Sequence, residues 1–313
     1  MNDRALFQRR IYALLALAAL IFSIFAIRLI DVQAVQAKGF ATRASNEMWN
    51  SSVLLAPRGT ITDVNGLELA RSVAAINIVV DQTMITDPAT TASVVAPALK
   101  MEPATVAALL TGTKRYQIVA KQAKPAQWIA LNDALSAYNK EVMKQRGGLA
   151  KRLVGFFSER SYVRDYPTGR LAASLVGIIN YAGVGASGLE ASMESVLAGK
   201  NGRYDYANGA GTIIPGSQQF VTEAKPGTGI QLTIDRDVQW VAQNAISQAV
   251  KSSRAASGTV IVMDPKTGEI LAQASAPNFD PANTKSISIE SLRNPAVQDV
   301  YEPGSTGKII TIA

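Results

Sequence analysis

The 313-residue chain contains no cysteine and no histidine. The lack of cysteine excludes disulfides, a thiolate nucleophile and a cysteine-ligated zinc site. The lack of histidine removes the commonest general base and the commonest metal ligand, which excludes Ser-His-Asp triads and most zinc hydrolase designs. A serine enzyme built from this sequence therefore needs a lysine base, and no cofactor is implied.

Charged residues make up only 18% of the chain, against 48% hydrophobic residues, which is typical of a packed protein long enough for two domains. The net charge is +7. Lysine and arginine are scattered along the sequence without an aromatic-interleaved basic patch, so a nucleic-acid partner is not expected. The charge suits an acidic membrane surface or cell wall.

An apolar run at residues 11–27, extended to residue 30, is long enough to cross most of a bilayer core. Four charged residues precede it: Asp3, Arg4, Arg9 and Arg10. The positive-inside rule then predicts a cytoplasmic tail at 1–10, a transmembrane helix at 11–30 and an extracytoplasmic remainder. A cleaved signal peptide ending near Val35-Gln36-Ala37 is the alternative, but the run is longer than a usual signal segment.

The middle of the chain contains turns and a helical stretch. A polar helical stalk is predicted around residues 32–49, and Asn65-Gly66 predicts a hairpin between two strands. Residues 88–148 are predicted to form a helical insert with Trp128 in its core. The expected role of this insert is structural, either packing against the rest of the domain or acting as a spacer. Arg164 and Glu190 have the charges for an ion pair between two glycine-containing turns. Residues 226–229 read as a linker and a domain boundary.

The C-terminal third alternates strands and a helix. Asp235 is an N-cap for a helix at 236–252. Its predicted buried stripe comprises Val238, Val241, Ala242, Ala245 and Ala249. Two apolar strands, 258–263 and 269–274, flank a turn at 264–268. Lys266-Thr267-Gly268 spells the K-T-G of serine acyltransferases, but its place at a hairpin tip indicates turn chemistry instead.

Ser305 and Lys308 are the candidate nucleophile and base. Pro303-Gly304 marks a turn, and the following residues predict a helix that begins at Ser305 and carries Lys308 on the same face. A lysine can deprotonate serine if burial or nearby positive charge lowers its pKa. The N–H groups of the helix start would favour an oxyanion beside Ser305. The structural alternative is a serine that only caps the helix.

Several landmarks follow one another along the chain. They are Arg58-Gly-Thr, Asn65-Gly66, Arg164 with Tyr166-Pro167, Gly185 with Gly188 and Glu190, Asp235 with Gln239, residues 262–272, Phe279-Asp280-Pro281 and residues 301–308. The last run is similar to the S-x-x-K motif of penicillin-binding proteins, whose other motifs are S-D-N and K-T-G. The ordered set resembles the class B penicillin-binding proteins.

This resemblance implies an α+β fold in several parts. A pedestal (dimerisation) domain at 31–225, with the helical insert 88–148, follows the transmembrane helix. Residues 226–313 form the N-terminal part of an incomplete α/β transpeptidase domain of the serine β-lactamase-like type. The implied location is the bacterial plasma membrane, in a single pass with a cytoplasmic N-terminus.

The resemblance also implies a D,D-transpeptidase of cell-wall synthesis and division. Ser305 would be acylated by the D-Ala-D-Ala stem peptide of peptidoglycan or by β-lactams, with Lys308 as base. No glycosyltransferase motif is found, so a lipid-linked glycosyltransferase of the division complex is implied as a partner. The rivals are a non-catalytic membrane-anchored scaffold, and a β-lactam sensor or β-lactamase relative.

Two features depart from the family pattern. Gly307 stands where the family usually has a bulkier residue, and glycine inside a helix costs roughly 1 kcal/mol relative to alanine. The sequence also stops at Ala313, before the second serine motif and the K-T-G strand. The sequence therefore predicts a fragment of a longer reading frame, inactive by itself, with an uncovered apolar face on its last helix.

Overall fold

The computed structural model describes residues 3–31, 33, 36, 39, 49–209, 212–213, 217, 219–283 and 287–312. The stalk predicted at 32–49 lies almost entirely outside these residues. The chain divides into two compact units, one made of residues 1–53 with 203–223 and the other of residues 54–202 with 224–313.

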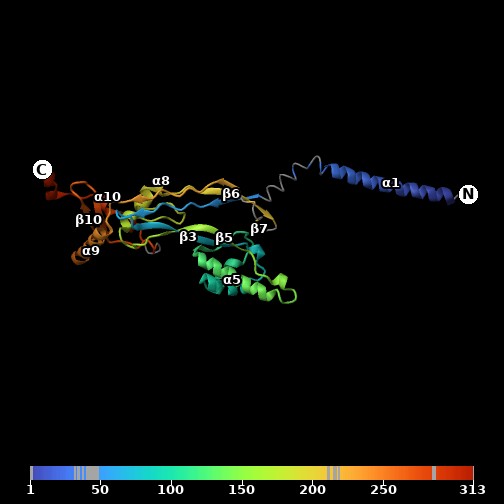
Figure 1. Cartoon of the computed structure of the whole chain (residues 1–313), viewed down its shortest axis with the longest axis horizontal. Helices are drawn as coiled ribbons and strands as arrows, with labels where there is room; N and C mark the ends of the chain where they lie inside the picture. The colour runs from blue at the N-terminus through green and yellow to red at the C-terminus, as the bar shows by residue number, and fades with distance from the viewer. Residues whose placement is uncertain are drawn as a thin grey trace. The chain divides into compact units, whose positions relative to one another are not determined.

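The first unit contains the N-terminal helix α1 (Asp3–Ile30) and a small sheet. The stretch Tyr12–Ile30 has a mean hydropathy of 2.6 and is long and apolar enough to cross a membrane (Figure 1). Arg28 Nη1 lies 2.6 Å from Asp31 Oδ2 where this stretch ends. In the sheet, β6 (Gly202–Gly209) pairs with β1 (Trp49–Leu54), β7 (Thr212–Ile213) and β8 (Gln219–Thr222).

The second unit is built on a five-stranded sheet in which the long β3 (Glu68–Val80) is central. β3 pairs antiparallel with β5 (Phe156–Asp165) over ten residue pairs, and also with β4 (Gln117–Ala123) and the short β2 (Ile61–Thr62). β9 (Ile230–Gln231) runs parallel to β2 and brings the C-terminal third of the chain to this sheet.

The hairpin predicted at Asn65-Gly66 is confirmed, and it joins β2 to β3. Gly66 has a φ of 80°, which glycine adopts without strain. The buried Asp63 carboxylate fixes the turn because its Oδ1 accepts hydrogen bonds from the N–H groups of Asn65 (2.9 Å) and Leu67 (2.8 Å).

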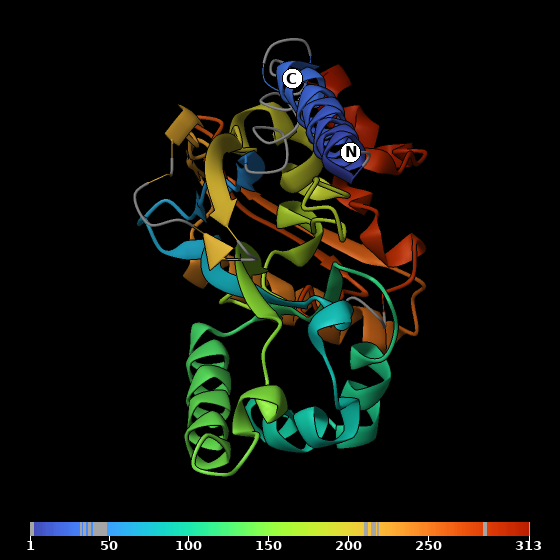
Figure 2. The ribbon, with the colours of Figure 1, turned by 90° about the vertical axis from the view of Figure 1, so that its right-hand side faces the viewer.

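Three helices of the insert pack together beside the sheet (Figure 2). They are α3 (Pro88–Leu99), α4 (Pro103–Leu110) and α5 (Pro125–Val142), and each begins at a proline. Their shared core includes Ile78 and Leu131, both fully buried, and Trp128 packs against it, so the predicted core role of Trp128 is confirmed. The insert is not wholly helical, because β4 lies between α4 and α5 and pairs with β3.

Short helices follow β5: α6 (Ala173–Val176), α7 (Gly188–Ser192) and α8 (Glu194–Leu197). The C-terminal part begins with α9 (Arg236–Ser253), which packs on the hairpin of β10 (Gly258–Met263) and β11 (Ile270–Ala276). Beyond the hairpin come η5 (Glu290–Leu292), α10 (Pro295–Gln298), η6 (Gly304–Gly307) and α11 (Lys308–Ile312).

The N-cap predicted for α9 is confirmed, since the Asp235 carboxylate accepts hydrogen bonds from the N–H groups of Asp237 (2.9 Å) and Val238 (3.2 Å). The predicted buried stripe is partly wrong. Ala242 is buried and Val238 packs against the hairpin, but three members of the stripe are exposed: Val241, Ala245 and Ala249. The buried face is instead turned toward Gln239, which is 1% exposed.

The Lys266-Thr267-Gly268 turn is confirmed at the tip of the β10–β11 hairpin. Gly268 has a φ of 77°, and its N–H donates to the Asp264 carbonyl at 2.8 Å. The Asp264 carboxylate accepts from the N–H of Lys266 at 2.8 Å. These three residues therefore close a turn, and the exposed tip does not form the K-T-G strand of an acyltransferase site.

Candidate active site

Ser305 and Lys308 lie where the short helix η6 continues into α11. The turn is fixed because Thr306 donates from both its N–H and its hydroxyl to the Pro303 carbonyl, and the Lys308 N–H donates to the Ser305 carbonyl. Side chains three residues apart eclipse each other in a 3-10 helix. The two candidate residues therefore share one face at the start of a helix, as the sequence predicts.

Both side chains are exposed in the described part of the chain. No hydrogen bond joins Ser305 Oγ to Lys308 Nζ among the described residues. The described residues therefore enclose neither the serine hydroxyl nor the lysine amine. The structure thus places the pair on one helical face without joining the two groups.

The apolar side chains of the same helix are also exposed. Ile309 is 73%, Ile310 is 87% and Ile312 is 83% exposed. The sequence predicts this uncovered apolar face, and the described residues confirm it. A face of this kind is normally buried in a folded protein or covered by a partner.

The hairpin and helix that precede the site are fastened by glutamine side chains. Gln239 Nε2 donates to the Gln273 carbonyl at 2.9 Å, and Gln239 Oε1 accepts from the Gln273 N–H at 2.7 Å. Gln243 Nε2 donates to the Ser275 carbonyl at 2.8 Å. These bonds fix α9 against β11. Sequence reasoning missed this role, although the position of Gln239 beside the apolar stripe was the available signal.

The segment leading to Ser305 is held by local polar contacts. The Asn294 side chain caps α10 by accepting from the N–H of Ala296 at 3.2 Å, and Gln298 Oε1 accepts from the N–H of Asn294 at 2.7 Å. Arg293 Nη2 lies 2.5 Å from Asp299 Oδ1. α10 packs on both strands of the hairpin, so the chain approaches Tyr301 from a fixed position.

A cavity of about 730 Å³ lies beside this segment, but its lining includes neither Ser305 nor Lys308. Its lining includes Ser187, Gly188, Gln273, Arg293 and Asn294. Gln273 Nε2 is buried without a hydrogen-bond partner among the described residues. The cavity and the motif-derived pair are thus different places on the chain.

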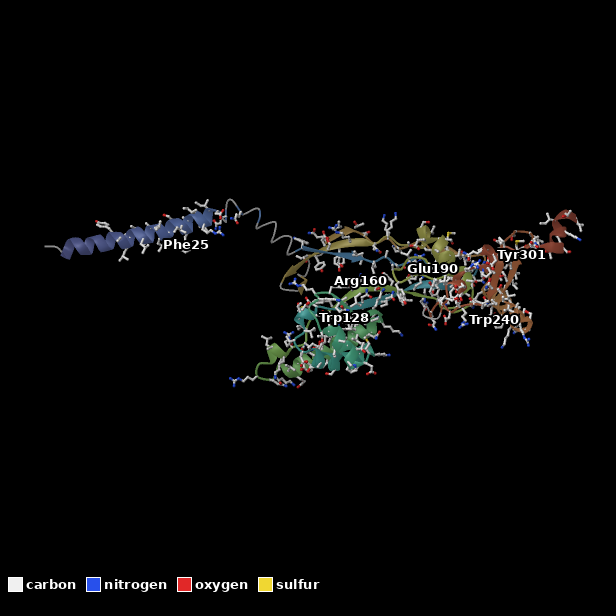
Figure 3. All side chains as sticks on the ribbon, turned by 180° about the vertical axis from the view of Figure 1, so that it is seen from behind. Phe25, Trp128, Arg160, Glu190, Trp240 and Tyr301 are labelled. Carbon is white, nitrogen blue, oxygen red and sulfur yellow. The ribbon has the colours of Figure 1, made fainter. Side chains whose placement is uncertain are left out.

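A buried ion-pair network ties the landmark turns together around Glu190. Figure 3 labels the position of Glu190 on the ribbon. Arg164 Nε lies 2.7 Å from Glu190 Oε1, which confirms the predicted pair, and Arg58 Nε lies 2.5 Å from Glu190 Oε2. Arg58 Nη1 also contacts Glu194 Oε2 at 2.7 Å. The side chains of Arg58, Arg164 and Glu190 are 8%, 2% and 0% exposed. Sequence reasoning missed Arg58 as the second partner.

Replacing Glu190 with glutamine is expected to destabilise the fold strongly. The variant keeps the shape but leaves the buried cations Arg58 and Arg164 without the Glu190 carboxylate, and breaking a buried pair in this way costs about 3–5 kcal/mol. Chemical denaturation of the purified protein measures the change. Asp299→Asn, which removes an exposed ion pair, is the control and should cost less than about 1 kcal/mol. Equal losses in the two variants would contradict a structural role for the buried network.

Tyr166 lies beside this network and is expected to make the stability of the protein depend on pH. Burial, with the charge of Glu190 as a second cause, raises the pKa of Tyr166 above its usual value. Because the folded protein then holds this proton more tightly than the unfolded chain, stability should fall as the pH rises above about 10. The Tyr166→Phe variant removes this contribution. The denaturation midpoint should therefore fall less between neutral and alkaline pH in Tyr166→Phe than in the unaltered protein. An equal fall in the two proteins would contradict the assignment.

Two protein-family models match the chain. The penicillin-binding protein dimerisation domain matches residues 53–232, which is more than half of the chain, and the penicillin-binding protein transpeptidase domain matches residues 258–313. The second match contains both Ser305 and Lys308.

Individual relatives agree with these family matches. Penicillin-binding protein PbpB of Mycolicibacterium smegmatis is 31% identical over 98% of this chain and 49% of the relative. Peptidoglycan D,D-transpeptidase FtsI of Buchnera aphidicola is 29% identical over 97% of this chain and 51% of the relative. The crystal structure of a peptidoglycan synthetase from Bifidobacterium adolescentis is 27% identical with a TM-score of 0.58, over 84% of this chain and 51% of that one. The chain spans about half the length of these relatives.

Proposed function

Because this chain belongs to the class B penicillin-binding proteins, we propose that it carries the nucleophile of a peptidoglycan D,D-transpeptidase. Ser305 is the nucleophile and Lys308 is its base. The observation that carries the proposal is the run Tyr301–Lys308, which lies within the transpeptidase match and brings serine and lysine to one face of a helix start. The chain contains no histidine, and a neighbouring lysine is a base that can activate a serine.

The proposed reaction has two steps. In the first, Lys308 takes the hydroxyl proton of Ser305 while the serine oxygen attacks the penultimate D-Ala carbonyl of a stem peptide. The peptide bond to the terminal D-Ala breaks, and that residue leaves with a proton on its amine. In the second, an amine of a neighbouring strand attacks the acyl-serine ester, forms the cross-linking amide and returns the hydroxyl to Ser305. A β-lactam would acylate the same oxygen by opening its ring.

The setting of this reaction is also proposed. Residues 31–225 form the pedestal with its insert at 88–148, and residues 226–313 belong to the transpeptidase domain. The N-terminal apolar helix anchors the chain in the plasma membrane, with residues 1–10 in the cytoplasm and the bulk of the chain outside. A lipid-linked glycosyltransferase is the proposed partner that would supply the glycan strands, as the class B family implies.

A membrane-anchored scaffold is the second candidate function. The observation that favours it is the exposure of both Ser305 and Lys308, without a hydrogen bond between them, in the described part of the chain. In that case the pedestal would recruit other wall-synthesis proteins and the acyl-transfer residues would be inert.

Release of D-alanine distinguishes the two functions. Protein made from the native gene would be incubated with a stem pentapeptide and an acceptor amine, and free D-alanine and cross-linked product would be measured. Release that a β-lactam blocks supports the transpeptidase. Intact partner binding with no release supports the scaffold and overturns the proposed chemistry.

A further inference from the structure

The net positive charge of this protein is concentrated in the insert and the few residues that follow it. Residues 88–152 contain ten lysines and arginines against three aspartates and glutamates, a net charge of +7 that equals the net charge of the whole chain. The rest of the chain is therefore electrically balanced.

Half of these cations lie in residues 140–152, which comprise the last turn of α5 and most of the loop that leads to β5, and which are here called the basic tip. They are Lys140, Lys144, Arg146, Lys151 and Arg152, and all are exposed. The tip has one carboxylate, Glu141, which pairs with Lys144 at 2.7 Å. The other four cations have no carboxylate within 4.0 Å among the described residues. Figure 1 shows the green loop after α5 projecting away from β3 and β5.

Two large apolar side chains stand among these charges. Leu149 is 70% exposed and Met143 is 51% exposed. A single exposed apolar residue needs no explanation, but here the two occur together within one short cationic loop. Exposed apolar side chains surrounded by lysine and arginine are the combination that interfacial membrane segments use.

The conformation of the basic tip is fixed by internal contacts. Its ends are clamped because Asn139 Oδ1 accepts from the Leu153 N–H at 2.8 Å and Asn139 Nδ2 donates to the Leu153 carbonyl at 2.9 Å. Val142 and Leu153 are buried at its two ends. A Cβ at Gly148 would lie 2.0 Å from the Val142 carbonyl oxygen, so only glycine fits this turn. A compact loop with close, clamped ends presents its outward side chains at little further cost in conformational entropy.

We propose that the basic tip docks on an anionic phospholipid surface, with Leu149 and Met143 entering the interface and the surrounding cations contacting lipid phosphates. This proposal rests on the membrane anchor proposed above and not on the acyl-transfer function. A soluble polyanion would use the cations but leave the two apolar side chains without a role, so a bilayer fits the whole loop better. The apolar helix at residues 12–30, proposed above as the membrane anchor, would hold the chain at a bilayer and so raise the effective concentration of the tip there.

The absence of cysteine makes the proposal directly testable in the full chain. Leu149→Cys provides a unique site for an environment-sensitive fluorophore, and Gln248→Cys on the exposed face of α9 provides the matched control. The labelled chains would be reconstituted in nanodiscs of phosphatidylcholine alone or with phosphatidylglycerol. We expect a blue shift, and quenching by spin-labelled lipid, only for the label at 149 and only with the anionic lipid. High salt should reverse both signals.

Charge removal adds a second readout. In the chain labelled at residue 149, Lys151→Gln with Arg152→Gln should lower the ratio of docked to undocked tip by roughly 30-fold, since each cation near an anionic surface contributes about fivefold. The control is Lys251→Gln with Lys266→Gln, which removes two exposed cations outside the insert and should leave the ratio unchanged. A label at 149 that stays in water in every lipid overturns the proposal. A response to soluble polyphosphate but not to anionic nanodiscs overturns it in favour of a soluble polyanion.

Discussion

Replacing Ser305 with alanine is expected to abolish both D-alanine release and covalent β-lactam attachment in the protein made from the native gene. The proposed acyl-enzyme forms at one oxygen, and the variant removes that oxygen while leaving the helix start in place. A neighbouring hydroxyl does not substitute for it, because the Thr306 hydroxyl already donates a hydrogen bond to the Pro303 carbonyl. A site without its nucleophile can still accelerate hydrolysis slightly by binding the substrate, but it forms no acyl adduct. Detection of the covalent adduct is therefore the decisive measurement.

A serine outside the proposed site provides the matched control for this variant. Ser288 lies on the same segment upstream of the helix and hydrogen-bonds to Ser291 at 2.9 Å. Ser288→Ala should label with penicillin like the unaltered protein. Labelling that persists in Ser305→Ala would place the nucleophile elsewhere and remove the basis of the proposed function.

Replacing Lys308 with glutamine is expected to slow acylation by about 10²- to 10⁴-fold, which is the usual contribution of a positioned general base. Ser305 stays present in this variant, so the adduct should still form, only slowly. The rate of labelling by a penicillin, followed over time, measures the effect. The adduct should keep the same mass and the same position as in the unaltered protein.

The chain offers a second lysine in a similar sequence context as the control for Lys308. Lys266 belongs to the Lys266-Thr267-Gly268 turn, which spells an acyltransferase motif but closes the β10–β11 hairpin. Lys266→Gln should label at an unchanged rate. A slow Lys266→Gln together with a normal Lys308→Gln would reverse the two assignments.

Local patterns in the sequence predicted much of the fold correctly. Asn65-Gly66 fixed a hairpin and Asp235 a helix cap, because both signals act between residues close in the chain. β4 was missed, since its strand conformation depends on pairing with β3, some forty residues away. The prediction of the buried stripe on α9 was partly wrong because the Gln239 side chain hydrogen-bonds to the backbone of β11 and lies on the buried face. The hydrophobic pattern of a helix predicts that a glutamine side chain faces solvent, but the hydrogen bonds to β11 place Gln239 on the buried face.

The candidate sites were predictable to different degrees. Charge type alone suggested that Arg164 pairs with Glu190, but it could not show that Arg58, 132 residues before Glu190, completes the network. The spacing of Ser305 and Lys308 predicted a shared helical face, which the structure confirms. Their catalytic roles stay a prediction, since the described residues leave both side chains exposed. The basic tip was missed because the sequence was searched for a basic patch interleaved with aromatic residues, and this segment combines its cations with the apolar Met143 and Leu149 instead.

The measurement that tests the central claim most directly is the mass of the native gene product before and after exposure to a penicillin, followed by peptide mapping. The proposed function predicts a gain of one drug mass, carried by the peptide that contains Ser305. A slow loss of this adduct is expected for a transpeptidase, and rapid loss would indicate a β-lactamase instead. A folded protein that gains no mass, or gains it on a peptide without Ser305, would contradict the account.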